Sequence, residues 1–229
     1  ILHASTQMGV HNLEGVKILE KLGFKRVVLS RETLLDEIKR IHDNSDIEIE
    51  FFVQGALCVS FSGNCYICSH LAGKSGNRGV CQQFCRLPYR FESDNITKQG
   101  FLLSAKDICL LDYLEKLKEV GVLSLKIEGR ARRPFYVAQT CKVYRKALDG
   151  ELVTDEEFTK FKIAFNREFT SAYFNGNGNI ISKIQGNNGV EIGEVVDFKM
   201  GKKFNEVFIK TDYNLQSKSG LKFLYKNKE

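Results

Sequence analysis

Five of the seven cysteines lie in a single segment between residues 50 and 90. They are Cys58, Cys65, Cys68, Cys81 and Cys85. Glycines separate the thiols and let the backbone fold closely around whatever the sulfurs hold. The sequence has no signal peptide and no apolar run near the roughly 20 residues that span a bilayer, so a cytoplasmic location is expected. Clustered cysteines in a reducing compartment are more often metal ligands than disulfides, which predicts a metal site.

The five thiols allow two sets of four ligands, and spacing alone does not choose between them. One set has the pattern Cys-x2-Cys-x12-Cys-x3-Cys, which suits a tetrahedral zinc ion, and consists of Cys65, Cys68, Cys81 and Cys85. The other set replaces Cys68 with Cys58, and its wider spacing suits an iron–sulfur cluster. Cys58 follows the end of a predicted strand, where parallel barrels carry their chemistry, which is a modest argument for the second set. Cys81 and Cys85 are expected to share one face of a helical turn.

Short strands and helices alternate on both sides of this segment. Before it, strands are predicted at 1–5, 26–30 and 47–53, with amphipathic helices at 12–22 and 33–41. After it, Ser104 and Asp107 have the spacing of a capping box and predict a helix that continues to about Glu119. A strand at 122–127 and a helix that starts near Pro134 and ends by Gly150 complete the pattern. Such alternation indicates parallel βα units.

We therefore expect an α/β fold, the C-terminal half of a TIM-like (β/α) barrel with a small C-terminal antiparallel β module. The predicted domains are a partial barrel at 1–150 with a cysteine-rich insertion at 55–90, a helix and linker at 151–188, and the β module at 189–229. A capping box formed by Thr154 and Glu157 begins the helix of the second region. The strands of the module are predicted at 190–198, 206–211 and 221–225.

The first residue is Ile1, inside an apolar run, and a native protein seldom starts in a core strand. We therefore expect the chain to be a fragment that lacks the N-terminal half of the barrel. The same expectation extends to the β module, whose last strand lies close to the end of the chain.

Polar side chains follow the predicted strands where each strand ends. In a parallel barrel these ends meet at one rim, so the side chains are expected to lie close together. Lys126 and Glu128 alternate along one strand, and Arg130 adds a guanidinium that can bind carboxylate or phosphate bidentately. The other members of this set are Thr6, Gln7, Arg31, Glu32 and Gln54. For each residue, a place in a salt-bridge network is an equally good interpretation.

The segment EFFVQGALCVSFSGNC resembles the signature of the collagenase-like peptidases, the U-type family numbered thirty-two. The matching residues are Glu50, Phe52, Gly55, Ala56, Leu57, Cys58, Gly63 and Cys65. Cys68 stands where the signature has serine, and Gln54 where many members have histidine. The stretches LHASTQMGVHNLEGVKILEKLGFKRVVLSRE and GFLLSAKDICLLDYLEKLKEVGVLSLKIEGR resemble the segments before and after it, in the order of the family.

The resemblance implies a cytoplasmic RNA-modifying enzyme with a barrel-like catalytic domain. Members of the family include tRNA uridine hydroxylases that depend on prephenate, and rRNA cytidine hydroxylases. Several members bind an iron–sulfur cluster through cysteines that match Cys58, Cys65, Cys81 and Cys85. The implied partners are tRNA or rRNA and a small anionic co-substrate such as prephenate, with no membrane. Two alternatives remain: a collagenase-like protease, as the name of the family states, and a non-catalytic, metal-stabilised RNA-binding module.

The polar residues at the strand ends receive roles as hypotheses. Glu32, Glu128 and Lys126 are candidate catalytic residues, with a glutamate to orient the substrate or transfer a proton. Arg31, Arg130 and Gln7 are candidate substrate-binding residues. The net charge of +6 favours polyanionic partners only weakly. No histidine lies in an HExxH motif and no serine in a G-x-S-x-G motif, so neither of these two hydrolase classes is indicated.

Overall fold

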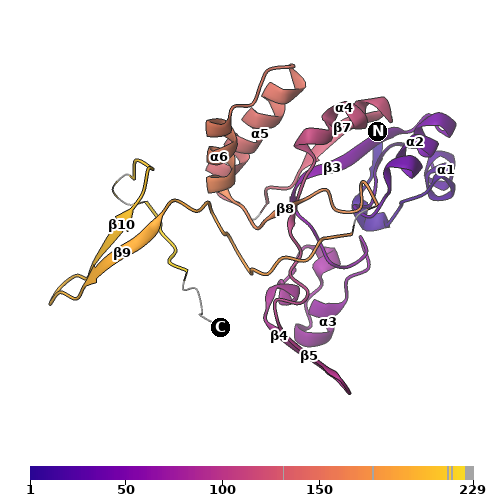
Figure 1. The fold of residues 1–229 in the computed structure, drawn as a ribbon. Helices are drawn as coiled ribbons and strands as arrows, with labels where there is room; N and C mark the ends of the chain where they lie inside the picture. Colours follow the sequence, from indigo (N-terminus) through magenta and orange to yellow (C-terminus); the bar gives the residue numbers. More distant parts are fainter. Residues whose placement is uncertain (131, 177, 216, 218, 225–229) are drawn as a thin grey trace. The chain divides into compact units, whose positions relative to one another are not determined.

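Four parallel strands form the centre of the sheet in this computed structural model (Figure 1), which describes residues 1–130, 132–176, 178–215, 217 and 219–224. Their order is β1, β2, β3 and β7, and each strand pairs in parallel with the next. Their bounds are Leu2–Ala4, Phe24–Val28, Glu48–Ala56 and Val122–Ile127. The predicted strands of this region are confirmed, as is the α/β class. The half barrel remains a prediction, because the sheet also contains an antiparallel strand.

That antiparallel strand, β6 (Asp107–Cys109), occupies the place where a helix is predicted. It pairs with the end of β3 and, in parallel, with β8 (Phe169–Thr170). The predicted helix is therefore wrong in its first half, and only α4 (Leu114–Glu119) is helical, after a 3-10 turn. Asp107 does not cap a helix because its carboxylate is buried and accepts hydrogen bonds from Arg167 at 2.7 Å and Arg132 at 3.4 Å.

Helices pack on one face of the sheet through alternate strand residues. Along β3, Phe51 and Val53 join the hydrophobic core with helices α1 and α2, whereas Phe52 and Gln54 alternate with them on the other face. The bounds of these helices are Leu13–Lys21 and Leu35–Asn44. Both helices are predicted correctly, because their apolar residues recur at helical spacing. The side chain of Asn12 caps α1 by accepting a hydrogen bond from the backbone of Gly15 at 2.9 Å.

Two further helices, α5 (Pro134–Leu148) and α6 (Asp155–Ala164), lie side by side in Figure 1. Both begin where local signals predict, α5 with proline in its first turn and α6 at the capping box of Thr154. From α5 the hydroxyl of Tyr144 donates a hydrogen bond to the carbonyl of Val53 at 2.7 Å. This bond ties α5 to the buried middle of β3.

The cysteine segment carries the short helix α3 (Ile67–Ala72) and extends away from the sheet together with a hairpin (Figure 1). The hairpin consists of β4 (Tyr89–Ser93) and β5 (Ile96–Gly100), and was not predicted. Its alternation of polar and apolar residues around an Asp–Asn turn is the signal that could have indicated it.

The chain divides into two compact units, residues 1–189 and 190–229. In the second unit, β9 (Glu194–Lys199) and β10 (Glu206–Lys210) pair antiparallel. The third strand predicted there is not formed at 221–224, and Tyr225 lies outside the described residues. Within the part of the chain that the structure describes, no helix is both long enough and apolar enough to cross a membrane.

The buried ion pair of Asp107 yields a first prediction. Asp107→Asn should lower the free energy of unfolding by about 3–5 kcal/mol, because it leaves two arginines without their shared negative partner in a low-dielectric site. Asp43→Asn is the matched control, since Asp43 pairs with Lys39 at 2.9 Å where both side chains are exposed. It should change the same quantity by less than about 1 kcal/mol. Urea denaturation of both variants measures the difference, and equal effects would contradict the prediction.

Candidate active site

The end of β3 approaches β7 more closely than any side chain would allow. Gly55 has a φ of +126°, and a Cβ added to it would lie 2.6 Å from the Cβ of Glu128. In turn, the backbone N–H of Glu128 donates to the carbonyl of Gln54 at 2.8 Å. A glycine is required here by both space and backbone angle. It lets the chain leave β3 directly beside Glu128 and enter the segment that contains Cys58.

The loop after Cys58 is held by residues that follow the other parallel strands. Gly63 has a φ of +77°, and a Cβ there would overlap the carbonyl oxygen of Gln7. The carboxylate of Glu32 accepts two hydrogen bonds from Ser62, from its backbone N–H at 2.7 Å and from its hydroxyl at 3.0 Å. Two proposed site residues, Gln7 and Glu32, thus contact the cysteine segment, and both position its backbone.

Cys68 lies in the short helix α3, and Cys85 lies in a 3-10 turn. Cys68 is buried in α3, and its sulfur accepts a hydrogen bond from the backbone of Gln82 at 3.3 Å. Cys85 lies in a 3-10 turn at Phe84–Arg86, and Cys81 lies outside that turn. Cys81 and Cys85 therefore do not share a helical face as predicted, because Gln83 between them has a left-handed φ of 58°.

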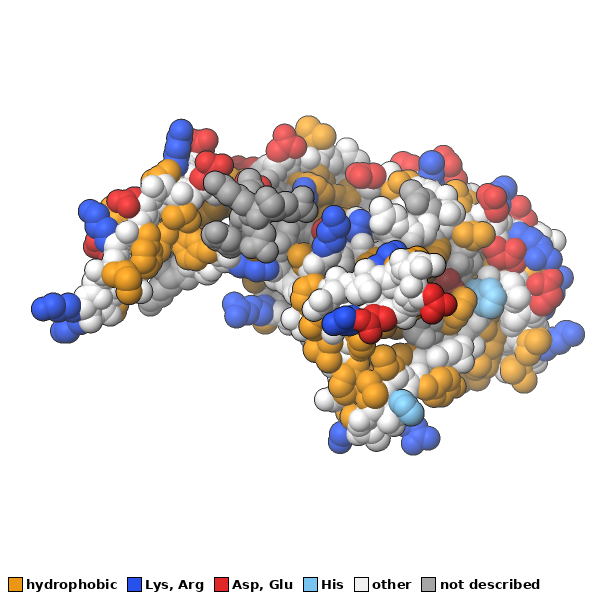
Figure 2. Space-filling model, turned by 60° about the horizontal axis from the view of Figure 1, so that its bottom comes forward, with side chains coloured by type: hydrophobic (Ala, Val, Ile, Leu, Met, Phe, Trp, Pro, Cys, Tyr) orange, Lys and Arg blue, Asp and Glu red, His pale blue; other side chains and the backbone are white. Residues whose placement is uncertain are grey.

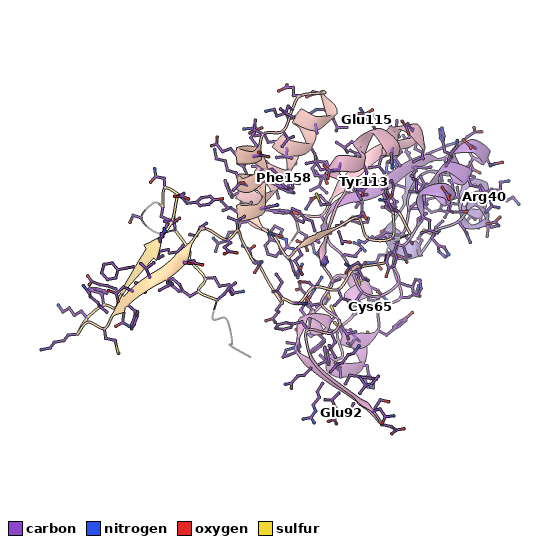
Figure 3. All side chains as sticks on the ribbon, viewed as in Figure 1. Arg40, Cys65, Glu92, Tyr113, Glu115 and Phe158 are labelled. Atoms are coloured by element: carbon purple, nitrogen blue, oxygen red, sulfur yellow. The ribbon has the colours of Figure 1, made fainter. Side chains whose placement is uncertain are left out.

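The five thiols nevertheless lie in one neighbourhood. Cys65 is labelled in Figure 3 and shows where the segment lies. Burial raises the pKa of Cys85, and the nearby thiols of Cys58, Cys81 and Cys65 raise it further against the charge of Arg86. Burial likewise raises the pKa of Cys81, which has the thiols of Cys68 and Cys58 as neighbours. Among the described residues no three His, Cys, Asp or Glu side chains are already arranged around one metal position. The thiols would therefore have to move to share a metal.

A half-buried cation, Arg31, adjoins the thiols. The guanidinium of Arg31 lies 4.0 Å from the ring centre of Phe52, and its Nε has no hydrogen-bond partner within the described part of the chain. Burial lowers the pKa of Arg31, whereas Cys58, Glu128 and Glu32 raise it. An unpaired buried donor is costly, so the guanidinium of Arg31 is only partly satisfied within the described residues.

Glu128 and Arg130, which follow β7, lie toward the cysteine segment, whereas Lys126 in β7 pairs with β3. Glu128 accepts a hydrogen bond from the backbone of Arg130 at 3.1 Å, and the Arg130 guanidinium reaches the cysteine segment, where a Cβ added at Gly79 would lie 3.3 Å from it. Lys126 instead forms a 2.8 Å ion pair with Glu50. Burial raises the pKa of Glu50, but the hydrogen bond and the charge of Lys126 lower it overall. The surroundings of Lys126 are therefore those of a salt bridge.

Two further residues complete the site. Gln54 is buried, its Oε1 lies 3.2 Å from the Tyr144 hydroxyl, and its Nε2 is unpartnered among the described residues. Sequence reasoning missed Arg86, which is buried directly after Cys85. No sequence signal separates it from the many exposed arginines and lysines of a basic chain.

The known proteins that this chain resembles carry names of two kinds, RNA hydroxylation and proteolysis. Residues 1–183 match the profile described as peptidase family U32. A 23S rRNA 5-hydroxycytidine synthase of Escherichia coli is 45% identical over 152 residues, which cover 65% of this chain and 23% of that protein. A tRNA hydroxylation protein of Bacillus subtilis is 36% identical over 191 residues, 76% of this chain and 45% of that protein. A protein of Porphyromonas gingivalis named collagenase is 32% identical over 198 residues, which cover 76% of this chain and 48% of that protein.

The chain thus spans less than half the length of these three curated relatives. No solved structure matches it.

The contact between Gly63 and Gln7 yields a second prediction. Gly63→Ala should push the loop away from Gln7, because the new Cβ has no space. Cys58 and Cys65, on either side of the displaced loop, should then react several times faster with iodoacetamide in the metal-free chain. Peptide mass spectrometry after timed alkylation measures both rates.

Gly73→Ala is the matched control, since Gly73 also has a positive φ of +62° but has open space around its Cβ position. Both variants carry a backbone strain of about 1–2 kcal/mol, so only the contact differs. The exposed Cys141 provides an internal reference for reagent activity. Equal alkylation rates in the two variants would show that the Gln7 contact does not hold the loop.

Proposed function

The chain belongs to peptidase family U32, and we propose that it is part of an enzyme that hydroxylates a base of tRNA or rRNA. The relatives named for rRNA hydroxycytidine synthesis and for tRNA hydroxylation support this reaction class. The structural observation that carries the proposal is the gathering of thiols next to the partly unsatisfied guanidinium of Arg31. Thiols and a cation at one place can hold an inorganic centre and an anionic compound together.

The proposed cofactor is an iron–sulfur cluster held by Cys58, Cys65, Cys81 and Cys85. The donor set fits such a group chemically, because Cys85 has the other three members as its thiol neighbours. When bound, the cluster would supply one-electron transfer. A zinc ion held by the set with Cys68 in place of Cys58 is the alternative, and the proximity of Cys68 to Cys81 favours it.

The side chains around the thiols would bind and orient the substrate. Arg31 supplies a guanidinium charge near Cys58 for a carboxylate or phosphate group, and the guanidinium of Arg130, just beyond β7, reaches the cysteine segment at Gly79. A small anionic co-substrate such as prephenate would suit these two guanidinium groups. Glu128, close to Arg31, is the carboxylate best placed to hold a proton or a substrate hydroxyl. Glu32 would act indirectly, because both of its oxygens already hold Ser62.

The surface charge of this chain would not be enough by itself to bind RNA. The face shown in Figure 2 mixes basic, acidic and hydrophobic side chains and has no continuous basic field. We propose that the four parallel strands belong to a TIM-like (β/α) barrel in a cytoplasmic protein. The parts of the relatives that this chain does not cover would then supply further RNA contacts and the rest of the rim.

A peptidase is the second candidate, favoured by the name of the family and by the relative named collagenase. A thiol nucleophile would need a base within hydrogen-bond reach. In the described part of the chain no histidine makes a hydrogen bond to a cysteine; His11 bonds to the carbonyl of Gly9, and His42 packs next to Gly121. The cationic surroundings of the thiols thus agree better with cofactor binding than with a thiol–imidazole pair.

A third prediction tests the reaction. Disruption of the gene should remove one hydroxylated nucleoside from tRNA or rRNA, and the intact gene should restore it. Cys58→Ala should not restore it, whereas Cys141→Ala should, because Cys141 is exposed on α5 outside the cysteine segment. Nucleoside mass spectrometry of both RNA classes measures the outcome. An unchanged nucleoside profile together with loss of proteolysis would favour the peptidase instead.

A fourth prediction separates the two ligand sets. Anaerobically purified Cys58→Ala should lose most of its iron and sulfide, and Cys68→Ala should keep both, because only Cys58 belongs to the proposed cluster set. Iron, sulfide and zinc per chain are measured for each variant and for the unmodified protein. The reverse order, with zinc lost from Cys68→Ala alone, would favour the zinc set.

A further inference from the structure

Arg86 ties together the two ends of the cysteine segment. Its guanidinium donates to the carbonyl of Leu57 at 2.8 Å, to the hydroxyl of Ser104 at 3.1 Å and to the carbonyl of Ala105. Leu57 immediately precedes the first thiol of the segment, and Arg86 immediately follows the last. One buried side chain therefore holds the backbone beside Cys58 close in space to the residue that follows Cys85.

All three acceptors of Arg86 are neutral, which is unusual for a side chain with only 6% of its surface exposed. Within the described residues Arg86 forms no ion pair. Arg132 and Arg167, the other buried or partly buried arginines nearby, share the carboxylate of Asp107. Removing a charge from water costs several kcal/mol unless an opposite charge compensates it. Arg86 is thus a buried cation that has no negatively charged partner among the described residues.

The nearest groups that can carry negative charge without an existing partner are thiols. Burial and the like charge of Arg167 lower the pKa of Arg86, and Cys85, Asp107 and Cys58 raise it. Asp107 is already shared by two arginines, so only Cys85 and Cys58 remain. Arginine keeps its proton at any ordinary pH, so an anionic centre held by these sulfurs is the compensation that would be available to it. Thiolates are the form in which cysteine binds metals.

We propose that Arg86 is a positioning residue whose fixed charge stabilises an anionic metal–thiolate centre that includes Cys85, which belongs to both ligand sets. This inference rests on the proposed function only in requiring a metal on these thiols, and it holds for iron–sulfur or zinc alike. In either centre the thiolates bring more negative charge than the metal alone neutralises. An anionic centre at these sulfurs would supply the partner charge that Arg86 lacks among the described residues, and cation and centre would then stabilise each other.

The test compares the zinc affinity of variants with that of the unmodified chain. Hydrogen bonds that Arg86 makes both with and without metal do not contribute to this affinity. Arg86→Gln removes the charge and retains hydrogen-bond donors, and Arg86→Lys retains the charge and loses the guanidinium fork. Zn²⁺ is titrated into the anaerobic metal-free chain against a chromophoric chelator, since zinc binds thiolates without redox chemistry. Arg86→Gln should weaken zinc binding by about 10–100-fold, the usual effect of losing a group that supports metal ligands. Arg86→Lys should weaken it by only a few-fold.

Arg167→Gln is the matched control, because it removes another buried guanidinium, which is paired with Asp107 at 2.7 Å. It should lower thermal stability with and without metal and leave zinc affinity nearly unchanged. Unchanged affinity in Arg86→Gln, or equal losses in the glutamine and lysine variants, would overturn the inference. If Arg86→Gln does not fold without metal, as judged by circular dichroism, the lysine variant decides alone, and its failure to bind zinc overturns the inference. Failure of the unmodified chain to bind either metal would instead overturn the proposed cofactor.

Discussion

The close contact between Gly55 and Glu128 is the constraint on which the rest of the site depends. β3 pairs with β2, β7 and β6, so its end fixes where three other strands deliver their side chains. Because no Cβ intervenes at Gly55, the chain passes directly from the sheet into the cysteine segment. The loop then returns to Gln7 and Glu32, at the ends of the neighbouring strands. The thiols are thereby held at the same rim as Arg31.

Charge is distributed unevenly beneath this rim. Arg86, Arg132 and Arg167 lie in one buried neighbourhood with Asp107 as the carboxylate that pairs with two of them. Such an excess of buried cations is unfavourable by itself in a low-dielectric environment. The proposed anionic centre at the neighbouring thiols would offset this cost. The fold and the proposed metal centre would thus be energetically coupled through Arg86, whereas Arg132 and Arg167 are compensated by Asp107.

Local signals in the sequence predicted local structure well. Asn12, Pro134 and Thr154 mark the starts of their helices because capping depends on residues only a few positions away. The helix predicted from Asp107 failed because its carboxylate pairs with Arg167, 60 residues along the chain. Arg86 was missed for the same reason: its acceptors come from distant parts of the chain. The thiols of the cysteine segment are neighbours in the structure, but the ligand set stays a prediction, since spacing does not fix direction in loops.

The candidate roles assigned from strand ends separate once the partners of each side chain are known. Glu32 and Lys126 are engaged, with Ser62 and Glu50 respectively, and stabilise the architecture. Arg31 and Glu128 lie close to each other and to Cys58, and Arg31 retains an unpaired donor. A fixed cation, a carboxylate and a thiol in one place can bind an anion and orient a hydroxyl beside an inorganic centre. None of these three groups is an imidazole, so a thiol nucleophile at Cys58 would need its base from elsewhere in the protein.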